Sequence, residues 1–301
     1  EFTESVRIGT MFAAQVVAAC GDVMQTGHES SGACRGFELF DERSAIDIAV
    51  AAAARAEMML SARRAPGGMM PVVLSSEAGG TMVHEAIGHG LEADLVQGGV
   101  SVYRGKVGEQ VASKLVTVID DATIPFARGS FYFDSEGVRG QKNILVENGI
   151  LKGYLYDRLT AMKDGCASTG NGRRESYHAK PIVRMTNTLI APGATPPEDI
   201  VRSVPQGLFV RKMGGGQVNT VTGDFMFEVS EGYLIENGAV CEPVRGATLT
   251  GSGPEVLQNI LMVGSDLGFG IGTCGKEGQG VPVSDAQPTL LISGMTVGGA
   301  V

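Results

Sequence analysis

The residues between positions 84 and 92 concentrate metal-binding and acid–base side chains, in a chain that has only four histidines. His84 is followed directly by Glu85, and His89 and Glu92 complete the stretch. Neutral imidazoles with a neighbouring carboxylate suit zinc, and the carboxylate is placed to take a proton from a water activated by the metal. The residue types therefore predict a hydrolytic zinc site. The same string is also compatible with ordinary polar residues on an irregular, glycine-rich helix start.

The spacing of the two histidines predicts a distorted helix. In the H-E-x-x-H motif the histidines are four residues apart and share a helix face. Here the pattern is HExxxH, and five residues at roughly 100° each turn His84 and His89 about 140° apart. A single wide turn with an i to i+5 hydrogen bond would realign them, and such turns are frequent at functional sites. Gly88 lies where we expect this distortion.

A zinc site in a hydrolase needs at least a third protein ligand. Glu92 lies three residues after His89 and can reach the same face of a helix. Cys274 is distant in sequence, but neighbouring glycines could present its thiolate. Chemistry alone leaves the two candidates equal, and a buried apolar thiol is the ordinary alternative for a free cysteine.

Composition excludes several classes of function. The 301 residues carry a net charge of −9 and a pI near 5.0, which argues against a nucleic-acid binder. The longest apolar run, Ile48 to Ala54, is far shorter than the roughly 20 residues of a membrane span. Five scattered cysteines without a C-x-x-C pair argue against a disulfide framework and favour the cytoplasm.

The first part of the chain is predicted to be helical. Residues 11–19 and 45–62 have helical patterns, and residues 27–32, which include His28, are expected to form a surface turn between them. Arg63 to Gly68 interrupts the pattern and marks a domain boundary, so residues 1–66 and 67–301 are expected to be separate domains.

The second part is predicted to be mostly β-structure. A buried strand at residues 71–75 precedes a helix that begins near residue 81, with Thr81 as N-cap, and carries the two histidines. Asn148-Gly149 and Asn237-Gly238 indicate hairpins. We expect an α+β fold with a large, mostly antiparallel sheet. Further strands are expected at residues 115–119, 130–133, 182–190, 208–212, 225–230 and 233–235, and helices at 196–203, capped by Thr195, and 254–263.

Three glycine-rich strings follow the motif, near residues 170–177, 214–217 and 272–279. None is a P-loop, which argues against ATP binding. For the first two strings, two interpretations are equally good: a turn that lets the backbone come close to a ligand or another strand, or an ordinary loop. Arg174 and Gly215 in these strings are assigned a supporting or substrate-binding role.

Longer stretches of the chain resemble one known family. They include SSEAGGTMVHEAIGHGLEAD, STGNGRRESY, GGGQV, VRGATLTGSGPEVLQNILMVGSDL and TCGKEGQGVPV. Together they are similar to the C-terminal two thirds of TldD-like members of the TldD/PmbA metallopeptidase family. The family's N-terminal region is absent here, so residues 1–66 are expected to be the end of a middle α/β domain.

The resemblance implies a ligand set and a partner. It implies that His84, His89 and Cys274 bind zinc and that Glu85 is the general base, and it moves Glu92 to a supporting role. It also implies a heterodimer with a PmbA/TldE-like subunit that lacks the metal motif, and a chamber that admits unfolded or small peptides. An extended substrate would pair with a strand edge.

Two alternatives follow from the same residues. A non-catalytic adaptor would use the glycine-rich β half to bind peptides or a partner, and its binding would be indifferent to chelation. A cysteine peptidase that pairs Cys274 with His178 is the second, although His178 is expected to be a surface or strand residue.

Overall fold

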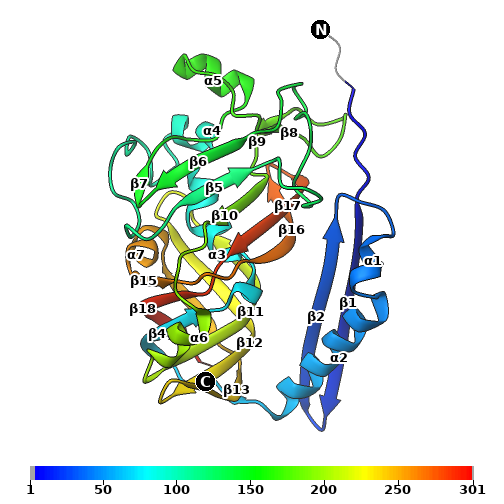
Figure 1. Cartoon of the computed structure of the whole chain (residues 1–301), viewed down its shortest axis with the longest axis vertical. Helices are drawn as coiled ribbons and strands as arrows, with labels where there is room; N and C mark the ends of the chain where they lie inside the picture. Colours follow the sequence, from blue (N-terminus) through cyan, green and yellow to red (C-terminus); the bar gives the residue numbers. More distant parts are fainter. Residues whose placement is uncertain (1–3, 300–301) are drawn as a thin grey trace.

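The computed structural model describes residues 4–299. A β-hairpin and a long helix lie beside a larger body that is built from two β-sheets and short helices (Figure 1). Of the fifteen pairings between named strands, three are parallel, namely β4–β11, β3–β13 and β10–β17. The predicted α+β class with mostly antiparallel sheets is confirmed.

The N-terminal unit is a hairpin covered by a helix, not two helices. β1 (Thr10–Cys20) and β2 (Val23–Ala33) pair along their whole length, so the predicted helix at 11–19 and the predicted turn at 27–32 are wrong. The alanine- and valine-rich β1 has no strong local preference, and pairing with β2 decides its conformation. Gly27 lies so close to α2 that a Cβ there would be 1.9 Å from the Ala52 carbonyl oxygen.

The predicted helix at 45–62 is confirmed as α2 (Ala45–Ser61), preceded by the short α1 (Leu39–Glu42). A buried ion network joins α2 to the larger body. Arg55 Nη2 lies 2.9 Å from Glu29 Oε2 of β2, and Arg55 Nε lies 2.6 Å from Glu231 Oε2 of β12. Removal of one partner would leave an uncompensated buried charge, so this network fixes how the unit sits on the sheet.

The larger sheet contains a closed barrel. Its strand order is β11-β4-β18-β14-β12-β13-β3, and β15 also pairs with β18. An additional pairing of β11 with β12 closes β11, β4, β18, β14 and β12 into a ring. The strands are β3 (Arg63–Arg64), β4 (Gly68–Leu74), β11 (Gln206–Val218), β12 (Asp224–Glu236), β13 (Ala239–Arg245), β14 (Thr248–Ser252), β15 (Ile260–Val263) and β18 (Leu290–Gly298).

The second sheet has six strands in the order β16-β17-β10-β5-β6-β7, which leaves β16 at an edge. A separate pair, β8 (Gly172–Arg173) and β9 (Ile182–Val183), lies nearby. The six strands are β5 (Val118–Asp121), β6 (Lys142–Glu147), β7 (Ile150–Leu151), β10 (Asn187–Ile190), β16 (Gly268–Lys276) and β17 (Gln279–Gln287).

Both predicted Asn-Gly hairpins are confirmed, because each dipeptide has positive φ angles, 49° and 82° at Asn148-Gly149 and 50° and 74° at Asn237-Gly238. The unpredicted Glu277-Gly278 turn between β16 and β17 has the same shape, with φ of 49° and 73°.

Several other predicted elements need correction. The predicted strand at 130–133 is a loop, the strand at 115–119 is shifted to β5, and the strand at 182–190 is interrupted between β9 and β10. The predicted helix at 254–263 ends early, because α7 (Gly253–Gln258) is followed by β15. The N-caps are Gly80 and Pro196 instead of Thr81 and Thr195. Two further helices are α5 (Arg158–Asp164) and α6 (Pro197–Arg202).

The segment that carries the histidines lies between the barrel and the second sheet (Figure 1). It runs from β4 through a 3₁₀ turn (Ser76–Ala78), α3 (Thr81–Val83), a π-turn (His84–Gly88), a second 3₁₀ turn (His89–Leu91) and α4 (Ala93–Gln97). The predicted domain boundary before residue 67 stays a prediction. Across residues 4–299, no helix combines the length and the apolar character needed to cross a membrane.

Candidate metal centre

The helix is distorted between the two histidines, as their spacing predicts. His84–Gly88 forms a π-turn, in which the His89 N–H donates to the His84 carbonyl five residues earlier. The two imidazole rings consequently lie 4.9 Å apart, centroid to centroid, at 87°. Gly88 has an ordinary helical φ of −53°, so the turn does not need glycine for its backbone angle. A Cβ at Gly88 would lie 2.2 Å from Met185 Sδ, so a larger residue there would require the buried Met185 side chain to move.

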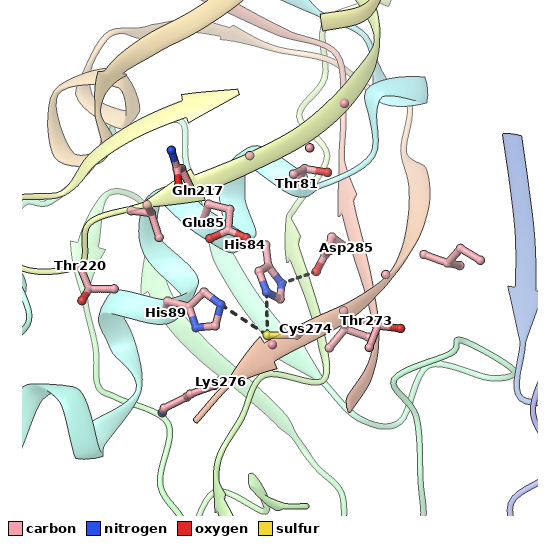
Figure 2. A pocket seen from close by; sticks show the side chains of 18 of the residues that line it. Thr81, His84, Glu85, His89, Gln217, Thr220, Thr273, Cys274, Lys276 and Asp285 are labelled. Atoms are coloured by element: carbon pink, nitrogen blue, oxygen red, sulfur yellow. Dashed lines mark hydrogen bonds and ion pairs between the residues drawn. The ribbon is translucent and has the colours of Figure 1, made fainter. Parts of the chain in front are cut away.

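Both rings point at the thiol of Cys274 on the edge strand β16 (Figure 2). Cys274 Sγ lies 3.1 Å from His84 Nε2 and 3.4 Å from His89 Nε2. A candidate ligand atom from each of the three residues lies within 4.8 Å of the other two. In a tetrahedral zinc site the sulfur and nitrogen ligands are about 3.6 Å apart. The three donors therefore fit a zinc ion after small adjustments.

Each histidine is oriented by a carboxylate on its other ring nitrogen. His84 Nδ1 lies 2.7 Å from Asp285 Oδ1, and His89 Nδ1 lies 2.9 Å from Glu92 Oε2. A carboxylate on Nδ1 fixes the tautomer and the ring and leaves Nε2 for a metal. Glu92 is fully buried behind His89, on the side away from Cys274. Asp285 on β17 was not predicted, because 201 residues separate it from His84 and no local pattern marks it.

Lys276, also missed from the sequence, holds Glu92 in place. Its ammonium lies 3.1 Å from Glu92 Oε2, 2.7 Å from Asp94 Oδ1 and 3.0 Å from the Val183 carbonyl. These three acceptors use the three N–H donors of a lysine. Lys276 therefore balances the buried Glu92 charge and has no donor left for a ligand.

The two histidines and Cys274 strongly shift one another's pKa values. Burial opposes a positive charge on His84, but Asp285 and Cys274 raise its pKa well above the usual range. Burial is likewise outweighed at His89, whose pKa Glu92 and Cys274 raise to about 10. Burial would raise the pKa of the Cys274 thiol, but both histidines lower it to about 5. A thiolate between two imidazoliums is an arrangement in which protons occupy the place of a metal.

Glu85 opens onto a cleft of about 660 Å³ that the three candidate ligands also line. Burial raises the pKa of its carboxyl, and the nearby histidines counteract this effect. One wall of the cleft is the end of β11 (residues 214–218), and the other is β16 (residues 271–276). Figure 2 shows Glu85 between His84 and Gln217, on the cleft side of the histidines.

The other two predicted site residues have different positions. Gly215 lines the cleft, and a Cβ there would have no atom within 4 Å. Its neighbour Gly216 packs on β12, where a Cβ would lie 1.9 Å from Phe227 Cδ1. Arg174 is exposed and lines a different cavity, so it is not brought to the candidate metal centre. His178 is exposed in a loop, and the histidines beside Cys274 are His84 and His89.

Residues 67–299 match the family described as PmbA/TldA metallopeptidase C-terminal domain. The chain is 47% identical over 289 residues to the metalloprotease TldD homolog of Haemophilus influenzae, covering 92% of this chain and 60% of that protein. It is 32% identical over 287 residues to the zinc metalloprotease TldD homolog of Saccharolobus solfataricus, covering 95% of this chain and 64% of that protein. The chain thus spans less than two thirds of these curated relatives.

Two crystal structures have the same fold. One is a proposed modulator of a DNA gyrase from Thermotoga maritima, with a TM-score of 0.79, 26% identity, and coverage of 96% of this chain and 62% of that chain. The other is TldE from Thermococcus kodakarensis, with a TM-score of 0.70, 22% identity, and coverage of 95% and 63%.

Proposed function

The chain belongs to the PmbA/TldA metallopeptidase family, and from this premise we propose that it is the catalytic part of a zinc-dependent peptidase. One observation carries the proposal: His84 Nε2, His89 Nε2 and Cys274 Sγ converge beside Glu85 in an open cleft. Two imidazoles and a thiolate are zinc ligands, and a relative of this chain is named a zinc metalloprotease.

Each residue has a defined task in the proposed hydrolysis of a peptide bond. Zinc, when bound, would supply Lewis acidity that lowers the pKa of water and polarises a carbonyl. Glu85 takes the proton from the attacking water and returns it to the leaving amine, because its carboxylate lines the cleft beside the grouped donors. Asp285 and Glu92 keep the imidazoles oriented.

The walls of the cleft favour peptides held by their main chain. Among residues 4–299, the cleft lining includes one lysine and no arginine, and the Lys276 ammonium is saturated by its own acceptors. β16 is an edge strand, and the end of β11 pairs with β12 but is not joined to β4. Extended small or unfolded peptides could add to such edges by backbone hydrogen bonds. We further propose a PmbA/TldE-like partner, as the resemblance to the PmbA/TldD family implies.

The proposal is tested by production of the chain with a PmbA-like partner, followed by zinc analysis and digestion of a peptide library with and without a chelator. One zinc per chain and cleavage that stops on chelation are the expected results. Peptide binding that persists after chelation, without cleavage, would instead identify the adaptor.

A cysteine peptidase is a second candidate, but its histidine would be His84 and not the expected His178. Cys274 Sγ, His84 Nε2, His84 Nδ1 and Asp285 Oδ1 line up at 3.1 and 2.7 Å, like a Cys-His-Asp triad. A second histidine on the same sulfur, His89 at 3.4 Å, favours the metal. Inactivation by iodoacetamide in the presence of zinc, without any effect of chelators, would support the triad.

Replacement of Asp285 by asparagine is expected to weaken zinc binding roughly tenfold to 100-fold, because loss of a carboxylate behind a histidine ligand has this effect. Competition with a fluorescent zinc chelator measures the affinity. Asp224→Asn, which alters an exposed carboxylate on β12, is the matched control and should bind zinc normally. Equal affinities for the two variants would show that Asp285 has no such role.

Replacement of Gly215 by valine is expected to lower kcat/KM by at least about tenfold, mainly through KM, because a side chain would fill space that the substrate backbone needs. The fold should tolerate the change, since a Cβ meets no atom within 4 Å. Gly153→Val is the control, because Gly153 has the same open surroundings outside the cleft. Steady-state kinetics and thermal unfolding of both variants measure the effects. Unchanged KM in Gly215→Val would exclude contact between substrate and this wall.

A further inference from the structure

A second cavity of about 380 Å³ lies beside β8 and β17. It is lined by Arg7, Arg173 and Arg174, together with the rings of Phe131 and Phe133 and with Pro282. Figure 1 shows β8 and the ends of β16 and β17 next to the N-terminal segment that carries Arg7. Three arginines in one cavity are unusual in a chain with a net charge of −9.

These arginines have no close acidic partner. Within residues 4–299, no ion pair joins Arg7, Arg173 or Arg174 to a carboxylate. Arg173 is only 4% exposed. Its guanidinium donates to the carbonyls of Met185 and Pro282 and lies over the Phe131 ring. A buried guanidinium whose protein partners are neutral carbonyls retains its positive charge for a ligand.

The cavity lining also contains two acids, Asp134 and Glu175, which accept hydrogen bonds from backbone N–H groups. The Asp134 carboxylate accepts hydrogen bonds from the backbone N–H groups of Glu136, Val138 and Gly172. Glu175 Oε2 accepts from the Gly280 N–H. Neither acid forms an ion pair with the cavity's arginines, so the lining holds three guanidinium groups against two carboxylates and favours an anion.

The positive charge of Arg173 is disfavoured mainly by burial, and Asp120 partly offsets the repulsion from Arg7. Burial, followed by repulsion from Arg7, lowers the pKa of Arg173 to about 9. Burial and Arg7 also lower the pKa of Arg128, which binds β16 through the Gly272 carbonyl and Thr273 Oγ1. A bound carboxylate would relieve this repulsion.

The cavity adjoins the cleft across one strand. Thr273 of β16 lines the cleft, and its cross-strand partner is Pro282 of β17, which lines the cavity. Neighbouring strands lie about 5 Å apart, and an extended residue spans about 3.3 Å. A peptide that leaves the cleft over Thr273 reaches the arginines within a few residues.

We propose that the Arg7–Arg173–Arg174 cavity binds a carboxylate of the substrate peptide, either an acidic side chain or the C-terminus, a few residues from the cleaved bond. This inference rests on the proposed function for the class of ligand. It makes the enzyme selective for an acidic group at one position, while the glycine-rich strand edges of the cleft accept different residues near the bond.

Binding to the Glu85→Gln chain tests the proposal without turnover. The probes are eight-residue neutral peptides with blocked ends that carry a single glutamate at each position in turn, and a second series with a free C-terminal carboxylate. Calorimetry at low salt should show about tenfold tighter binding for one or two glutamate positions or for the free C-terminus, the strength of one charge-assisted hydrogen bond. The two series distinguish the two sources of the carboxylate.

The gain should disappear when Arg174→Gln or Arg7→Gln is added, since both residues are exposed and can be replaced without disturbing the core. Arg64→Gln removes one exposed charge elsewhere and should leave the gain intact. Acidic and neutral peptides that bind equally, or a gain that survives both cavity variants, would overturn the inference. If acidic peptides bind more tightly but the unmutated chain cleaves no peptide, the proposed peptidase activity is wrong and the carboxylate site is retained.

Discussion

Glu85→Gln is expected to reduce kcat for peptide cleavage on the order of 10²- to 10⁴-fold, the usual contribution of a general acid–base group. Glutamine has nearly the same shape but cannot accept and return the proton. Glu85 lines the cleft and is not among the three grouped donors, so the zinc content should stay at one per chain. Elemental analysis and single-turnover kinetics on the same sample measure the two effects.

Glu77→Gln is the matched control for this variant. Glu77 lies in the 3₁₀ turn that leads to the same helix, outside the cleft lining, and its replacement should leave kcat unchanged. Full activity of Glu85→Gln would remove Glu85 from the mechanism. Loss of zinc together with activity would instead make Glu85 a ligand.

Cys274→Ser is expected to lower zinc affinity by more than the roughly 100-fold that loss of a supporting residue causes, because it removes the proposed thiolate ligand directly. Activity should fall in parallel with zinc content. Zinc competition and elemental analysis measure both. The variant should fold, because serine is slightly smaller than cysteine and the hydroxyl can bond to the histidines that face Sγ.

Cys166→Ser is the control, because Cys166 is an exposed free cysteine outside the cleft. It should retain zinc and activity. Unchanged zinc in Cys274→Ser would return Glu92 as the candidate third ligand, although Glu92 lies on Nδ1 of His89 and not on the Nε2 that faces Cys274.

The sequence determined the histidine motif and its backbone geometry. Two imidazoles five residues apart cannot share a face of a regular helix, so helix periodicity alone predicts the π-turn found at His84–Gly88. The Asn-Gly hairpins, the α2 helix and the α+β class are equally local in origin, because they depend on turn chemistry and side-chain periodicity.

The tertiary structure decided what depends on distant partners. Residues 11–19 became a strand because β2 pairs with them, and a composition of alanine and valine does not prevent it. Asp285 and Lys276 reach the histidine segment only because β16 and β17 fold against it.

The choice between Cys274 and Glu92 as the third candidate ligand also depended on the tertiary structure. Both have suitable chemistry and Glu92 is nearer in sequence, so residue types could not separate them. The fold places Cys274 Sγ opposite both Nε2 atoms and Glu92 behind His89. Sequence patterns specify which side chains a short segment carries and how its backbone bends. Strand pairing places Cys274, about 190 residues after His84, on the Nε2 side of each imidazole.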